Sequence, residues 1–151
     1  MGSLRISTLL KGNAVANYSM LKEIERFREF MPQIRKIKVL WRLPPNRQIS
    51  EWEVEVEGIT IHWKQEDTFD DEHRTFTFRI IEGDYRAEGS WKIDEVTTSR
   101  SKISIKARFD WGIPILGQQV GQALERKAKR NFMRMVAAFR KAQRDGVSIS
   151  G

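Results

Sequence analysis

The sequence predicts an α+β fold, a curved seven-stranded antiparallel sheet packed on a long C-terminal helix, with one or two short helices after the first strand. Apolar residues recur at every second position in seven segments, as they do in strands with one buried face. Turn-forming residues separate these segments at short intervals, which favours antiparallel hairpins. Because the sheet must cover its apolar face, we expect the last helix to pack against it.

The third strand segment, at residues 51–57, shows the alternation most clearly, because four glutamates occupy one side and tryptophan and valine the other. One side of this strand therefore faces water. The same alternation predicts these inward residues, in chain order: Leu4, Ile6 and Thr8; Ile37, Val39, Trp41 and Leu43; Trp52, Val54 and Val56; Ile59, Ile61, Trp63, Gln65, Asp67 and Phe69; Phe76, Phe78 and Ile80; Ala87, Gly89, Trp91 and Ile93; and Ile103, Ile105, Ala107 and Phe109.

Two segments, residues 14–31 and about 116–144, follow the helical period instead. In the first, Asn13 is a suitable N-cap, Val15 belongs to the apolar stripe, and Pro32 ends the pattern. In the second, Gly146 fits a C-cap. The apolar stripe of this long amphipathic helix consists of Val120, Leu124, Ala128, Phe132, Met135, Val136 and Phe139.

Composition narrows the class of protein. The chain of 151 residues is the size of one domain, and we assign residues 1–151 to a single ligand-binding domain. It has no cysteine, which excludes disulfides, thiolate metal sites and a cysteine nucleophile. No signal peptide is recognisable, and no segment approaches the roughly 20 apolar residues of a membrane span, so we expect a cytoplasmic protein. The net charge of +7 favours an acidic partner.

Three short strings carry a resemblance to a known family. They are IERFREFMPQIRKIKVL at residues 24–40, EGDYRAEGSWKI at residues 82–93 with Gly89 and Trp91, and FDWGIPILGQ before the helix that contains Asn131. Together with the element order, they resemble the START-like (SRPBCC, helix-grip) superfamily, which includes polyketide aromatase/cyclases and coenzyme Q binding proteins. The resemblance implies the helix-grip fold and an apolar ligand cavity between the sheet and the last helix.

The sequence departs from the aromatase/cyclase pattern at two positions. In those enzymes an arginine commonly faces the cavity four residues after the tryptophan of the fourth strand, and counting from Trp63 this position is Asp67. An aromatic residue near the start of the second strand is replaced by Ile34. These departures argue against cation-assisted chemistry, so whether the protein is an enzyme stays open, with cyclisation and dehydration as the leading possibility.

Asp67 is the candidate catalytic residue, because it shares the inward side of its strand with Trp63 and Phe69. Apolar surroundings raise the pKa of a carboxyl group by disfavouring its charged form, which suits a general acid or base. The alternative is that Asp67 lies at an open strand end beside the acidic turn at residues 70–72, where it is merely solvated.

The inward aromatic surface suits a flat polyketide or a quinone ring. A filled core would use the same residues, but the small inward residues Ala87, Gly89 and Ala107 favour a cavity. Gln65 and Asn131 are candidates to orient a polar group of the ligand, or they are satisfied by protein neighbours. The predicted ligand-binding residues are Trp52, Trp63, Gln65, Phe76, Phe78, Trp91, Asn131 and Met135.

Other chemistry is poorly supported. His62 and His73 lie in different kinds of place, so we expect no metal site. The chain has no glycine-rich phosphate loop and no G-x-S-x-G nucleophile motif, and we expect no cofactor. Three basic residues of the last helix, Arg126, Lys129 and Arg130, either dock an acidic acyl carrier protein or form an ordinary solvated face.

Three functions remain. The first is a polyketide cyclase or aromatase that folds a poly-β-keto chain in its cavity. The second is a non-catalytic carrier of a quinone or another isoprenoid lipid. The third, prompted by the basic pI of about 9.9, is a module that binds RNA or the ribosome, and we regard nucleic acid as the least favoured partner.

Overall fold

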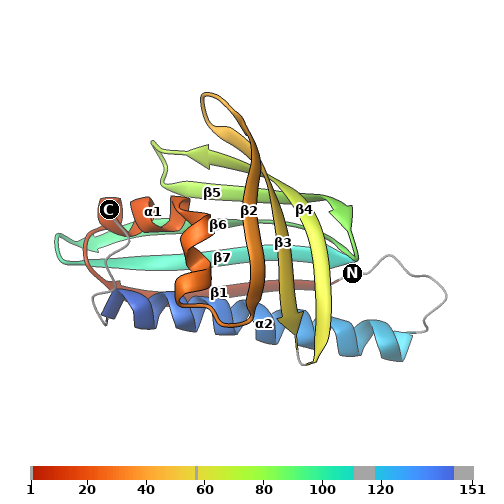
Figure 1. Cartoon of the computed structure of the whole chain (residues 1–151). Helices are drawn as coiled ribbons and strands as arrows, with labels where there is room; N and C mark the ends of the chain where they lie inside the picture. Colours follow the sequence, from red (N-terminus) through yellow and green to blue (C-terminus); the bar gives the residue numbers. More distant parts are fainter. Residues whose placement is uncertain (1, 57, 111–117, 145–151) are drawn as a thin grey trace.

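The computed structural model describes residues 2–56, 58–110 and 118–144, apart from some side chains in these ranges (Figure 1). The predicted fold class is confirmed. Its elements are the strands β1 (Gly2–Lys11), β2 (Ile34–Leu43), β3 (Arg47–Val56), β4 (Ile59–Asp70), β5 (Thr75–Gly83), β6 (Arg86–Thr97) and β7 (Arg100–Asp110), the helices α1 (Ala14–Lys22) and α2 (Gln118–Arg144), and the 3₁₀ helix η1 (Ile24–Glu29).

The seven strands form one antiparallel sheet in the order β1-β7-β6-β5-β4-β3-β2. Strands β2 to β7 pair with their chain neighbours, as the short turns predict, while β1 closes one edge by pairing with β7. The sheet curves over α2, which runs alongside β1 (Figure 1). The molecule is therefore two-layered, with its apolar core between the inner sheet face and α2.

Helix α2 presents its apolar stripe to the sheet. Within the described part, Phe132, Met135, Val136 and Phe139 are buried, as their spacing predicts, and Ala142 is buried as well. The predicted positions Val120, Leu124 and Ala128 and the C-cap Gly146 lie outside the described side chains and residues.

Helix α1 starts where its sequence predicts, because the Oδ1 of Asn13 accepts a hydrogen bond of 2.8 Å from the backbone N–H of Ala16. The prediction for Val15 was wrong, since its side chain is 68% exposed. Asn17 is buried instead, and its amide donates to the hydroxyl of Ser101 at 2.7 Å. This bond ties α1 to the start of β7.

Strand β2 departs from the predicted alternation. Trp41 and Leu43 were expected inward, yet they are 59% and 40% exposed. The pairing of β2 with β3 shifts register between Ile34 and Lys36 and again between Val39 and Trp41. Each irregularity exchanges the two faces of the strand, so Ile34 and Ile37, three residues apart, are the buried side chains.

Candidate functional site

An inner cavity lies between the sheet and α2. Its described lining consists of Leu21, Phe27, Trp52, Trp63, Gln65, Phe76, Phe78, Tyr85, Trp91, Phe132 and Met135, and its volume is about 20 Å³. Seven of the eight predicted ligand-binding residues thus line one space. The eighth, Asn131, has a side chain outside the described part. Whether these residues bind a ligand remains a prediction.

Stacked rings form the walls of the cavity. Trp52 and Trp63 are directly paired across β3 and β4, and their rings stack with centroids 5.6 Å apart and planes 10° apart. Phe78 of β5 stacks on Phe132 of α2 at 6.2 Å. Since cross-strand neighbours share a sheet face, the register of β3 and β4 alone places the two indoles together.

The sequence analysis did not identify Tyr85 as a cavity residue. Tyr85 lies two residues before Ala87 and so continues the inward positions of β6. It follows the turn at Gly83 and meets the edge of Trp63 with ring centroids 5.6 Å apart. Gly83 permits the close approach of β5 to β4 just before Tyr85, because a Cβ on Gly83 would lie 2.5 Å from the carbonyl oxygen of His62. Burial raises the pKa of Tyr85 above its usual range, so the phenol stays protonated.

A chain of hydrogen bonds runs along the inner side of β4. The indole Nε1 of Trp63 donates to the Oε1 of Gln65 at 2.7 Å, and the Nε2 of Gln65 donates to the Oδ1 of Asp67 at 2.6 Å. The three residues are two apart in sequence, so all point to the same face. This chain fixes the orientation of the Gln65 amide, because reversing it would set donor against donor at Trp63.

Two more chains reach Asp67 from β3. The hydroxyl of Ser50 donates to the Oδ2 of Asp67 at 2.7 Å and accepts from the Nε1 of Trp52 at 2.9 Å. The Nε2 of Gln48 also donates to Oδ2, at 3.0 Å. Gln48 and Ser50 were missed in the sequence, although they lie on the same alternation as Trp52. Three donors therefore converge on one carboxylate.

Asp67 is fully buried, so the alternative of a merely solvated carboxyl is wrong. Burial raises the pKa of Asp67 to about 6, while the hydrogen bonds from Ser50, Gln65 and Gln48 act in the opposite direction. The carboxyl group lies behind Gln65 and is not part of the described cavity wall. Its catalytic role remains a prediction.

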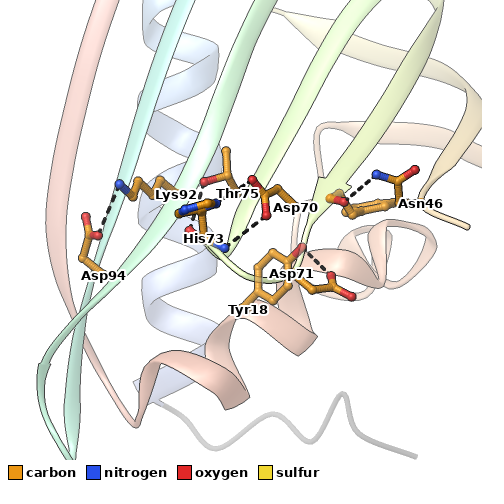
Figure 2. A network of polar contacts seen from close by, with 9 residues as sticks. Tyr18, Asn46, Asp70, Asp71, His73, Thr75, Lys92 and Asp94 are labelled. Atoms are coloured by element: carbon orange, nitrogen blue, oxygen red, sulfur yellow. Dashed lines mark hydrogen bonds and ion pairs between the residues drawn. The ribbon is translucent and has the colours of Figure 1, made fainter.

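The turn between β4 and β5 follows shortly after Asp67 and is contacted by other parts of the chain. Figure 2 shows the hydroxyl of Tyr18, on α1, donating to Asp71 at 2.8 Å and the amide of Asn46 reaching the end of β4. His73 and Asp70 form a second contact of 2.8 Å within the turn. The side chains of Asp70 and Asp71 remain exposed at this turn, whereas Asp67 and Phe69 before it are buried.

The small residues do not all make room for a ligand. Ala87 and Ala107 are buried on the inner face, as predicted. A Cβ on Gly89, however, would lie 2.2 Å from the carbonyl oxygen of Lys106 and 3.0 Å from the ring of Phe78. Gly89 therefore permits close packing between β6 and its neighbours and leaves no space beside it.

Surface features are more ordinary. The side chains of Arg126, Lys129 and Arg130 on α2 are exposed, which is compatible with docking and with solvation. Two larger hollows, of about 480 and 350 Å³, open on the surface and are lined mainly by charged residues. None of the described helices is long and apolar enough to cross a membrane.

Comparison with known protein families identifies one family for this chain. The family model for polyketide cyclase/dehydrase and lipid transport proteins matches residues 16–136. No curated protein sequence matches the chain.

Solved structures share the fold at low sequence identity. An aromatase/cyclase from a Streptomyces species is similar with a TM-score of 0.89 and 15% identity, covering 99% of this chain and 98% of that one. A protein from Thermus thermophilus is similar with a TM-score of 0.88 and 20% identity, covering 97% and 100%. A START superfamily protein from Mycobacterium smegmatis has a TM-score of 0.81 at 13% identity, covering 95% and 97%. The helix-grip fold is therefore shown.

Proposed function

Since the chain belongs to the polyketide cyclase/dehydrase and lipid transport family, we propose that it binds a flat poly-β-keto or aromatic ligand in the inner cavity and promotes its cyclisation and dehydration. The observation that carries this proposal is the amide of Gln65, an uncharged polar group that is held in one orientation within an aromatic wall. Apolar pockets commonly orient ligands through a few such groups. We place this activity in the cytoplasm.

The Gln65 amide has hydrogen-bonding capacity left for a ligand. One lone pair of its carbonyl accepts from Trp63 and one of its N–H groups donates to Asp67. A primary amide has two N–H donors and two acceptor lone pairs, so one of each remains. A keto or enol oxygen of a bound chain is a suitable partner for the free N–H.

Cyclisation requires mainly that the reacting carbons be held together. An enol carbon of the chain attacks a keto carbon while the enol hydroxyl loses its proton and the keto oxygen gains one. The resulting hydroxyl gains a second proton and leaves as water while the neighbouring carbon loses a proton. Holding the chain in this geometry removes much of the entropic barrier. A carboxyl group with a pKa of about 6 is suited to exchange these protons near neutral pH, and we assign this role to Asp67. Because its carboxyl group lies behind Gln65, this role requires that the opening of the cavity also expose Asp67 to the ligand.

Binding also requires the cavity to open, because about 20 Å³ accommodates little more than one water molecule. The strand side of the cavity is held by backbone hydrogen bonds, whereas Phe132 and Met135 reach it from α2 through side-chain contacts. We therefore propose that α2 moves away from the sheet to admit the ligand. The exposed Arg126, Lys129 and Arg130 would then receive an acidic acyl carrier protein beside this opening.

A carrier of a quinone or another isoprenoid lipid is the second candidate. It is favoured by the position of Asp67 behind Gln65 and by the described cavity lining, which includes no charged side chain. A carrier needs only the apolar wall and a fixed polar contact.

Product analysis with a synthetic poly-β-keto thioester distinguishes the two candidates. We expect the wild-type protein to change the distribution of cyclised products, and Asp67→Asn to bind the thioester and lose that change. The amide retains the shape of the side chain and lacks the proton chemistry. Binding without any effect of the wild-type protein on products would indicate a carrier, and absence of binding would contradict both proposals.

A further inference from the structure

The outer face of β1 and β7 is strongly basic. Its outward positions carry six cations and one acid, Asp110. We call the cations the basic strip, and they are Arg5 and Lys11 on β1 and Arg100, Lys102, Lys106 and Arg108 on β7. All six are exposed, because the buried residues of both strands occupy the alternate positions.

The pairing register sets like charges against each other within the basic strip. Arg5 lies directly opposite Lys106, and Lys11 lies directly opposite Arg100. Like charges in these positions destabilise a sheet. Within the described part of the chain, these four residues form no ion pair. The electrostatic repulsion between the paired cations is therefore not offset by neighbouring acids.

The other edge of the same outer face is arranged differently. There Arg35 pairs with Glu55, and Arg47 lies 2.8 Å from Glu66. Beside the basic strip, β6 sets two acids directly opposite strip cations, Glu88 opposite Arg108 at 4.0 Å and Asp94 opposite Lys102. The remaining four cations of the strip, Arg5, Lys11, Arg100 and Lys106, face one another, and their concentration on β1 and β7 indicates an anionic partner for this face.

We propose that the basic strip docks the protein on an anionic lipid surface. The cations are spread along strands of 10 and 11 residues, on the order of 33 Å at about 3.3 Å per residue, which suits an extended plane of negative charge. Leu9, 47% exposed and directly opposite Lys102, adds an apolar contact for the boundary between headgroups and acyl chains. No aromatic residue occupies the outward positions of the two strands, so bases of single-stranded nucleic acid would find no stacking platform.

This docking goes beyond the proposed cavity function. The basic strip lies on the opposite side of the sheet from the cavity, and the hydrogen-bonded strands separate the two. A protein held by its outer face leaves α2 free to move. Membrane docking and ligand binding can therefore be tested independently.

Co-sedimentation of the full chain with phosphatidylcholine vesicles, with and without about 30% phosphatidylserine, tests the proposal. We expect binding only to the vesicles that contain phosphatidylserine, weakening as salt rises. The informative variant is Arg5→Glu with Lys11→Glu, because each new glutamate faces a cation, Lys106 or Arg100, and the fold should be retained. Its affinity for these vesicles should fall at least about ten-fold.

The matched control is Arg28→Glu with Lys38→Glu, which changes the net charge equally and lies away from β1 and β7. It should change vesicle affinity less than about two-fold. Equal losses in the two double variants, or no wild-type binding to phosphatidylserine, would overturn the proposal. So would a strip variant that loses affinity for a duplex RNA and keeps its affinity for vesicles. Thermal unfolding of both variants checks that they remain folded.

Discussion

The two halves of the inner sheet face are both buried and differ in their polar content. On β6 and β7, Ile93, Ile103 and Phe109 are at most 1% exposed and pack as an apolar core. On β3 and β4, Ser50 and Asp67 are each 0% exposed, yet they form a polar network around a carboxylate. Apolar burial stabilises the fold, whereas a buried carboxylate is costly even when it is hydrogen-bonded. The network around Asp67 is therefore not explained by a gain in stability.

The largest expected effect comes from the apolar half. Phe109→Ala should lower the free energy of unfolding by about 3 to 5 kcal/mol, because it removes a fully buried ring and leaves a cavity. Urea denaturation measures this loss. A loss below about 1 kcal/mol would contradict the assignment of β6 and β7 as the stabilising half.

The polar half should instead make stability depend on pH. The pKa of Asp67 is about 6 in the folded protein and 3.8 for the unperturbed group, so the folded state binds the proton more tightly. Stability contributed by this group is fully present below about pH 4 and is lost as pH rises through about 6, with a span on the order of 3 kcal/mol.

Urea denaturation between about pH 4 and pH 7.5 measures this dependence, and Asp67→Asn provides the control. The variant should lack this part of the pH dependence, because its amide does not titrate. An identical slope in both proteins would mean that Asp67 has no raised pKa.

A smaller effect is expected from the hydroxyl that supports the carboxylate. Ser50→Ala removes one of three donors to Asp67 and should destabilise the protein by about 1 to 2 kcal/mol at pH 7. It should also raise the pKa of Asp67 further, since the lost bond favours the charged form. The midpoint of the pH dependence should therefore move upward, and a downward shift would contradict this role for Ser50.

The sequence predicted the parts of this arrangement that depend on alternation. Trp52, Trp63, Gln65 and Asp67 lie on the inner face because the pairing of β3 with β4 is regular over their length. Trp41 was misplaced because the irregular pairing of β2 with β3 reverses a strand face and leaves no recognisable mark in the residues.

Some features that the sequence analysis missed could have been recognised in the sequence, whereas others depend on contacts between residues far apart in the chain. Gln48, Ser50 and Tyr85 lie on alternations already recognised, so extending each pattern by a few residues would have included them. The role of Gly89 depends on the approach of β7, and the size of the cavity depends on ring stacking. The convergence of three donors on Asp67 depends on which strands are neighbours, and no single segment contains that information.

The central claim, that the Gln65 amide holds the ligand, is tested most directly by calorimetric titration with a dihydroxyanthraquinone. Gln65→Leu removes the amide from the cavity wall, whereas Gln48→Leu removes the other amide that donates to Asp67 and lies outside the described lining. We expect about ten-fold weaker binding for Gln65→Leu and unchanged binding for Gln48→Leu. Equal effects of the two substitutions, or none from either, would contradict the claim.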